Sequence, residues 1–252
     1  MKDNTKRFSN RVDDYVKYRP SYPNEITKYI LSEKFNLTNT SVAADVGSGT
    51  GIFTEILLKS INTVYSVEPN DEMRNEAEKR LGKFSGYFSV SGSAESTNLK
   101  SCSIDFITVA QAFHWFDLGK TKEEFKRILK SNATIFLIWN KRRIDTDFLD
   151  EYEKIIQAKI PEYKEVNHHN ITQDILKQFL DKDFSRTEFK YNQAFDFEGV
   201  IGRLRSSSYC PKPGTKLYTE IEGEMKRNFD RNSINGKASF NYDTEVYSGK
   251  FA

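Results

Sequence analysis

One loop, the segment ADVGSGTG at residues 44–51, has a composition that suits close contact with a ligand. Three glycines stand at alternate positions in it, Gly47, Gly49 and Gly51. They remove the Cβ atoms that would keep a ligand away, and they permit backbone angles that are closed to other residues. An apolar run precedes the loop and a helical pattern follows it, so its backbone amides point at the carboxyl edge of a sheet. We expect a ligand to lie against this loop.

The spacing of the glycines narrows the choice of ligand. The loop reads G-x-G-x-G, whereas the dinucleotide fingerprint is G-x-G-x-x-G, and Ile52 stands where the third fingerprint glycine would be. This departure argues against a bound pyrophosphate. Glu68 ends the next predicted strand, where a carboxylate can accept hydrogen bonds from both ribose hydroxyls of an adenosine group. Ribose binding by itself fits a nicotinamide or an adenosyl cofactor.

The first half of the chain alternates between short apolar runs and amphipathic stretches. This alternation is typical of a parallel sheet covered by helices on both faces. The pattern predicts strands over 41–47, 63–70, 87–95, 104–113 and 133–140, and helices over 51–60, 71–81 and 119–130.

The second half has a different organisation. Helical patterns cover 147–160 and 172–180, and polar and aromatic residues alternate over 185–197 and 238–251. We expect the latter two segments to form antiparallel strands that close one edge of the sheet, with partly helical chain between them. The length favours a single domain over 1–252. In it, a core of about 38–140 would be covered by segments 1–37 and 141–236.

Composition gives no support to several classes of function. The 252 residues include 38 basic and 36 acidic ones, a net charge of +2, so no strong field favours nucleic acid or an anionic membrane. Cys102 and Cys210 stand apart and predict free thiols in a reducing compartment, with no metal site. No apolar run approaches the ~18 residues of a membrane span. We therefore expect a cytoplasmic protein.

Four segments in the order VAADVGSGTGIFT, VYSVEPNDEM, SGSAESTNL and AQAFHWFD resemble the class I S-adenosylmethionine-dependent methyltransferases. The chain looks most like the small-molecule group that includes the trans-aconitate methyltransferase-like proteins. Segments 8–23, 203–214 and 242–251 also resemble that group, so the likeness extends over nearly the whole chain. It implies a Rossmann-like, doubly wound, seven-stranded α/β sheet, mostly parallel with an antiparallel strand at one edge, and helical cover segments.

The resemblance implies S-adenosylmethionine as cofactor and S-adenosylhomocysteine as product. The implied cofactor contacts are Asp45, Gly47, Gly49, Gly51, Glu68, Met73, Ala94, Glu95 and Gln111. In this scheme Asp45 meets the ammonium of the methionine part, Glu68 holds the ribose diol, and Glu95 accepts from the adenine amine. Structural interpretations stay open, since Met73 suits the core, Glu95 a helix cap and Asp45 a loop-ordering acceptor.

Catalysis by methyl transfer requires mainly alignment and the exclusion of water. His114 follows the fourth predicted strand and is a candidate base for a hydroxyl acceptor, although a structural or substrate-contacting role fits it too. We expect Trp115 and Phe116 to wall the pocket, unless they belong to the core. His168 and His169 receive no role.

Polar and aromatic residues in two segments are candidates for acceptor contacts. They are Tyr15, Tyr18, Arg19, Arg203, Arg205, Ser208 and Tyr209. Arginine binds carboxylates bidentately, so a small carboxylic acid is the predicted acceptor. The alternative for RLRSSSY is an ordinary helix face with its cap.

Three functions are consistent with these patterns. A small-molecule methyltransferase is favoured, because the loop, Asp45, Glu68 and the SAE turn agree on one ligand. A non-catalytic module that binds S-adenosylmethionine shares every cofactor feature. An NAD(P)-dependent oxidoreductase shares the sheet and Glu68 but lacks glycine at position 52. No proline pair follows the fourth strand, where enzymes that methylate exocyclic amines of bases carry one, so nucleic acid is not an expected partner.

Overall fold

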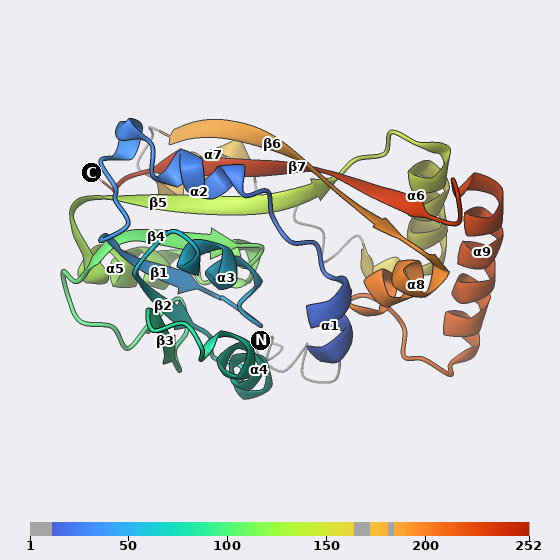
Figure 1. Cartoon of the computed structure of the whole chain (residues 1–252), viewed down its shortest axis with the longest axis horizontal. Coiled ribbons are helices and arrows are strands. Elements are labelled where there is room, and N and C mark those ends of the chain that lie inside the picture. The colour runs from blue at the N-terminus through green and yellow to red at the C-terminus, as the bar shows by residue number, and fades with distance from the viewer. Residues whose placement is uncertain (1–11, 164–171, 181–183, 252) are drawn as a thin grey trace.

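The computed structural model describes residues 12–163, 172–180 and 184–251 of the chain. These residues form one seven-stranded sheet in the order β3-β2-β1-β4-β5-β7-β6 (Figure 1). Its strands are β1 (Val42–Val46), β2 (Thr63–Val67), β3 (Tyr87–Val90), β4 (Ile104–Ala110), β5 (Leu129–Arg142), β6 (Phe184–Phe195) and β7 (Ala238–Gly249). The expected Rossmann-like fold is confirmed.

The direction of the strands follows the predicted pattern. Strands β1 to β5 run parallel to one another, and β7 runs antiparallel to both β5 and β6. The antiparallel strand therefore lies one place in from the edge, which β6 forms. The strand order reverses between β1 and β4, and ligands bind at such a reversal, outside the carboxyl ends of the strands.

Three expected strands end earlier than the sequence suggests, and the one expected over 63–70 ends at Val67. The strand expected over 87–95 ends at Val90, because the chain turns back at Gly92, where an added Cβ would lie 2.7 Å from the Thr97 carbonyl oxygen. The strand expected over 104–113 ends at Ala110, since Gln111 has a left-handed backbone with φ of 59°. These endings release the chain into loops at the carboxyl edge.

The helices either cover the faces of the sheet or lie beyond its strand ends. They are α1 (Val12–Tyr18), α2 (Glu25–Ile30), α3 (Ile52–Leu58), α4 (Asp71–Leu81), α5 (Leu118–Ile128), α6 (Asp147–Lys159), α7 (Gln173–Phe179), α8 (Phe197–Arg205) and α9 (Lys216–Asn232). Buried residues of α2 and α3 pack on one face, and those of α5 and α7 pack on the other. Adjacent residues such as Ala43 and Ala44 belong to the two different clusters, as strand alternation requires.

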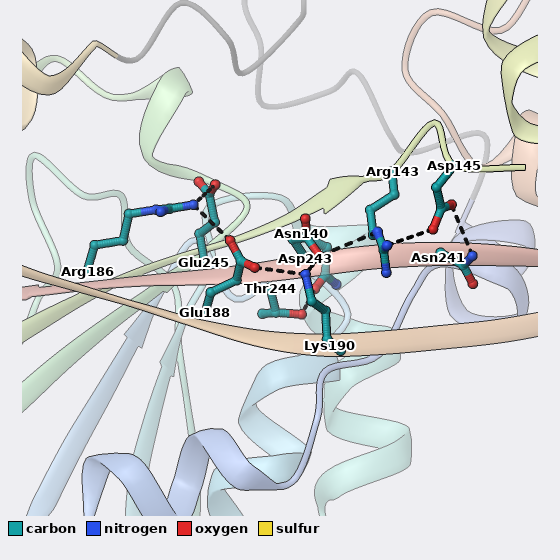
Figure 2. A network of polar contacts seen from close by, with 10 residues as sticks. All are labelled: Asn140, Arg143, Asp145, Arg186, Glu188, Lys190, Asn241, Asp243, Thr244 and Glu245. Carbon is teal, nitrogen blue, oxygen red and sulfur yellow. Dashed lines mark hydrogen bonds and ion pairs between the residues drawn. The ribbon is translucent and has the colours of Figure 1, made fainter.

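The strands differ greatly in length, and this difference creates room beside the carboxyl edge. Strand β5 has 14 residues and β7 has 12, whereas β1 and β2 have five each. The long strands extend toward a group of helices, α6, α8 and α9, that share a separate apolar cluster with β7 (Figure 1). Cross-strand ion pairs, Arg186 with Glu245 and Lys190 with Asp243, each at 2.6 Å, run along β6 and β7 (Figure 2).

The first helix lies against this helical group. The Tyr18 hydroxyl donates a hydrogen bond to Glu198 Oε1 at 2.8 Å, and the Arg205 guanidinium pairs with Asp14 at 3.0 Å. These contacts join α1 to α8, although the two helices are far apart in the sequence. The N-terminal segment thus closes one side of the space beyond the strand ends.

Other expectations concern the cysteines and the membrane. Cys102 is exposed, Cys210 is buried, and neither is in a disulfide. Within the described ranges, no helix combines the length and apolarity needed to cross a membrane. His168 and His169 lie outside the described residues.

Candidate cofactor and acceptor site

A cavity of about 310 Å³ opens where the parallel strands end. Four residues at or after strand ends line it. Asp45 belongs to β1, Glu68 follows β2, Gln111 follows β4, and Asn140 is among the last residues of β5. Residues from α1, α6 and α8 close it from the other side. The cavity therefore joins the sheet edge to the helical group.

The three loop glycines have positive φ angles of 70°, 57° and 77°, which glycine adopts without strain. Their surroundings differ. A Cβ on Gly47 would lie 2.5 Å from Ala112 Cβ, and one on Gly51 would lie 2.5 Å from Leu81 Cδ1. A Cβ on Gly49 would meet nothing closer than Met73 Sδ at 3.8 Å. Gly49 thus borders open cavity, whereas Gly51 allows α3 and α4 to pack closely.

Asp45 is fully buried at the base of the loop. Its Oδ2 accepts a hydrogen bond from Thr54 Oγ1 at 2.6 Å, and its Oδ1 accepts one from Thr108 Oγ1 at 2.9 Å. Burial raises the pKa of the carboxyl to about 6, and the two threonine hydroxyls limit the rise. Asp45 orders the loop, as its structural interpretation states, and it also lines the cavity.

Glu68 is buried on the next strand end and is also tied to the loop. Its Oε2 accepts from the Gly49 amide at 2.8 Å, and its Oε1 accepts from the Asn70 amide at 2.9 Å. Burial raises its pKa. A carboxylate has about four acceptor positions, so two of them are available to a ligand.

We call the part of the cavity lined by Asp45, Glu68 and Glu95 its acidic end. The residues assigned to adenine lie there. Met73 and Ala94 are buried and line the wall. Glu95 lines it as well, and its Oε1 accepts from the Asp117 amide at 2.9 Å, at the start of α5. Glu95 thus makes the kind of bond that its interpretation as a helix cap predicts, and it still lines the cavity.

Aromatic residues follow β4 along the middle of the cavity. His114, Trp115 and Phe116 all line it, and the rings of His114 and Trp115 lie 4.6 Å apart. Gln111 donates from Nε2 to the Asn140 carbonyl oxygen at 3.2 Å. The turn after β4 therefore faces the cavity.

The opposite end of the cavity is cationic. Arg19, Arg142 and Arg203 line it with one carboxylate, Glu153. Arg203 donates from Nε to the Tyr242 hydroxyl at 3.2 Å and from Nη1 to Ser207 Oγ at 3.0 Å. Arg142 pairs with Glu153, which also accepts from the Tyr163 hydroxyl at 2.9 Å. This end holds a net positive charge in a mostly buried space.

Two guanidinium groups at this end retain hydrogen-bonding capacity. The Nε atoms of Arg19 and Arg142 are buried and have no partner among the described residues. Burial lowers the pKa of Arg19, and the charge of Arg203 adds to this effect. An anion would satisfy both the unused donors and the excess charge.

Comparison with known proteins identifies the domain that carries this cavity. Residues 44–137 match the sequence model of a family described as a methyltransferase domain. An uncharacterized methyltransferase-like protein of Schizosaccharomyces pombe is 34% identical over 152 residues, which are 60% of this chain and 58% of that protein. A Saccharomyces cerevisiae protein named as a probable S-adenosylmethionine-dependent methyltransferase is 29% identical over 130 residues, 50% of this chain and 43% of that one.

A solved structure extends the likeness to the whole fold. A candidate type II methyltransferase from Anaeromyxobacter dehalogenans superposes with a TM-score of 0.64 at 17% identity, over 92% of this chain and 98% of that one. Residues 44–137 are therefore a methyltransferase domain, and the described chain has the fold of the class I S-adenosylmethionine-dependent methyltransferases. The cofactor of this family is S-adenosylmethionine. The methyltransferase spans less than three fifths of the two S. pombe relatives it matches, at 58% and 59% of their lengths.

The methyltransferase cavity gathers most of the residues chosen from the sequence. Those that line it are Asp45, Gly47, Gly49, Glu68, Met73, Ala94, Glu95, Gln111, His114, Trp115, Phe116, Tyr15, Arg19, Arg203, Ser208 and Tyr209. Three predicted contacts do not line it. Gly51 packs against α4, Tyr18 turns to Glu198, and Arg205 pairs with Asp14. In a helix, Arg203 and Arg205 cannot share one face, and only the former points inward.

Several lining residues of the methyltransferase were missed from the sequence. Asn140 and Arg142 are in the segment WNKRR, at the carboxyl end of a predicted strand, and that position was a usable signal. Glu153, Tyr163 and Tyr242 come from α6, the turn after it and β7, and no local pattern marks them.

Proposed function

We propose that this methyltransferase transfers the methyl group of S-adenosylmethionine to a small-molecule acceptor, a carboxylic acid, by in-line displacement. The observation that carries the proposal is the opposite charge of the two ends of one cavity. Asp45, Glu68 and Glu95 line one end, and Arg19, Arg142 and Arg203 line the other. The acidic end suits a ligand with a positive sulfonium and ammonium, and the cationic end suits an anion.

The residues at the acidic end fit the cofactor. Gly49 leaves open space in front of the loop, which a side chain would fill, and the neighbouring Glu68 keeps acceptor capacity for a ribose diol. Asp45 would hold the ammonium, and Met73, Ala94 and Glu95 would enclose the adenine. When bound, S-adenosylmethionine supplies a methyl group already activated by its sulfonium. The protein's task is then to hold the acceptor in line and to keep water out.

The cationic end would bind and orient the acceptor. Arginine forks bind carboxylates through paired N–H donors, and Arg19 and Arg142 each have an unused Nε–H donor. A carboxylic acid is already ionised at neutral pH, so the reaction needs no base, and His114 then serves as a wall of the cavity. The described parts of 1–37 and 141–236 supply Tyr15, Ile144 and Tyr209, which would exclude water. The likeness to trans-aconitate methyltransferase-like proteins is consistent with this acceptor and stays a prediction.

The first experiment measures ligand binding. The purified protein is titrated calorimetrically with S-adenosylmethionine, S-adenosylhomocysteine and NADH in parallel. We expect micromolar binding of the two adenosyl ligands and none of NADH. Binding of NADH alone would overturn the proposal in favour of an oxidoreductase.

The second experiment tests the acceptor. The protein is incubated with S-adenosylmethionine and a panel of small carboxylic acids, each beside its matched carboxamide, and methyl esters are detected by mass spectrometry. We expect esters only from acids, with S-adenosylhomocysteine formed in equal amount. Cofactor binding without turnover of any acid or hydroxyl compound would favour the non-catalytic binding module.

A further inference from the structure

A short segment of the N-terminal region crosses the cavity, and we name residues 19–22 the strap. Arg19, Pro20 and Tyr22 line the cavity, whereas Ser21 between them does not. The Ser21 carbonyl oxygen instead accepts a hydrogen bond from Asn140 Nδ2 at 2.9 Å. The strap is thus bonded through its backbone to the carboxyl end of strand β5.

The same asparagine makes two further contacts. Its Oδ1 accepts from Thr244 Oγ1 of β7 at 2.6 Å, and Figure 2 shows the two side chains together beside β7. Its backbone oxygen accepts the side-chain amide of Gln111 at 3.2 Å. Asn140 is 5% exposed. It therefore contacts the strap, β7 and the turn after β4 from one buried position.

The orientation of the Asn140 amide is determined by its partners. The Ser21 carbonyl oxygen can only accept a hydrogen bond, so the amide nitrogen must face it. The carboxamide oxygen is then left to the Thr244 hydroxyl, which can donate. A carboxylate in the same place would oppose the Ser21 oxygen with another acceptor, and this predicts a specific effect for Asn140→Asp.

The strap has other anchors, and they hold its two ends. The preceding helix α1 is joined to α8 through Asp14 and Arg205, at 3.0 Å. At the far end, the Tyr22 ring packs edge-on against Phe53, with centroids 5.1 Å apart. Tyr191 of β6 also interacts with Ser21. Asn140 holds the middle of the strap through Ser21, which is two positions after Arg19 in the sequence. Arg19 lines the cationic end.

We propose that Asn140 is a positioning residue that couples the two ends of the cavity. Its side chain fixes the strap, and hence Arg19, at the cationic end. Its backbone oxygen fixes Gln111, which lines the cavity beside the acidic end. Binding of a ligand at the acidic end then orders the strap. Without the Asn140 amide, ligand binding at the acidic end no longer orders the strap. The assignment of the ends to cofactor and acceptor rests on the proposed function, whereas the link between Asn140 and the strap does not.

The test uses hydrogen exchange of a strap peptide covering 13–22, with and without S-adenosylhomocysteine. Wild type is compared with Asn140→Asp, Asn140→Ala and the matched control Thr244→Val, which removes the bond to β7 and keeps the donor to Ser21. We expect exchange of the strap amides to rise about tenfold in both Asn140 variants and to change little in the control. Saturating S-adenosylhomocysteine should slow strap exchange in wild type and the control, but not in Asn140→Asp.

Global stability and kinetics separate positioning from general damage. Peptides from α4 and α5 report global unfolding in the same experiment, and their exchange should stay at wild-type rates. Once an acceptor is known, Asn140→Asp should raise its KM more than it lowers kcat. Strap exchange at the wild-type rate in both Asn140 variants would overturn the inference. If wild type binds no S-adenosylhomocysteine, the proposed function fails, while exchange in the free protein still decides the role of Asn140.

Discussion

The two ends of the cavity are built in different ways. The acidic end comes from one stretch of chain, since Asp45 lies near the end of β1, and Glu68 and Glu95 follow the neighbouring strands β2 and β3. The cationic end takes its arginines from the strap that follows α1, from β5 and from α8. Residues in a short stretch can be recognised in the sequence as a motif. Arginines spread over positions 19 to 203 come together only in the folded chain.

The two ends also differ in how their charges are held. At the acidic end, backbone amides and threonine hydroxyls donate hydrogen bonds to the carboxylates. The same hydrogen bonds order the glycine loop and hold the carboxylates that line the cavity. At the cationic end, Arg203 is held by a tyrosine and serines, and Arg142 by the single carboxylate Glu153. The first end has its hydrogen bonds largely satisfied, while the second retains unused donors. Under the proposed function, the acidic end would be a rigid cofactor site and the cationic end an acceptor site that its ligand completes.

The largest expected effect is at the acidic end, with Gly49→Asp. The added Cβ has room, but the positive φ is unfavourable and the carboxylate would occupy the cavity beside Glu68. We expect affinity for S-adenosylhomocysteine to fall at least about 100-fold, or ~2.7 kcal/mol, by calorimetry. Unchanged affinity in a folded variant would show that the cofactor lies elsewhere.

A pair of substitutions tests the cationic end. Arg203→Met removes a lining guanidinium, and we expect the KM of a carboxylate acceptor to rise roughly 10- to 100-fold, the loss of one or two charge-assisted hydrogen bonds. The affinity for S-adenosylhomocysteine should stay within about twofold. Arg205→Lys is the control, because a lysine can keep the ion pair with Asp14 outside the lining, and the KM of this variant should hardly change. Equal effects of the two variants would contradict the assignment of Arg203.

A pH titration measures the charge of Asp45. Its folded pKa, about 6, is above the ordinary 3.8, so ionisation in the fold takes place between pH 5 and 7. Since the ammonium of the cofactor prefers the ionised carboxylate, affinity for S-adenosylhomocysteine should rise about tenfold over this range. The stability that Asp45 contributes to the free protein has the opposite trend: it is present below about pH 4 and is lost as the pH rises through 6. Asp45→Asn should flatten both curves.

The smallest effect is expected at the middle of the cavity. With a carboxylate acceptor, His114→Gln should change kcat less than about threefold, and its pH profile should keep its shape, because no proton has to be removed. A fall of 100-fold or more, with loss of an acidic limb in the pH profile, would instead identify His114 as a base and the acceptor as a hydroxyl. Trp115→Leu serves as a control for packing, since the two rings are neighbours.

The sheet, the loop and the acidic end of the cavity could be predicted from local features of the sequence. Apolar strands, amphipathic helices and glycines with special backbone angles are local features, and local physics places Asp45, Gly49 and Glu68 at adjacent strand ends. The sequence also indicated arginine as the acceptor-binding residue type, but it paired Arg203 with Arg205.

Which arginines meet depends on how distant segments pack in the folded chain. Helix α8 turns Arg205 toward Asp14 and Arg203 inward, and the length of β5 brings Arg142 and Asn140 to the same space. The docking of α1 on α8 adds Arg19 from the far end of the chain. These choices depend on long-range packing of buried groups, which leaves no period or spacing in the sequence, so the cationic end exists only once the chain has folded.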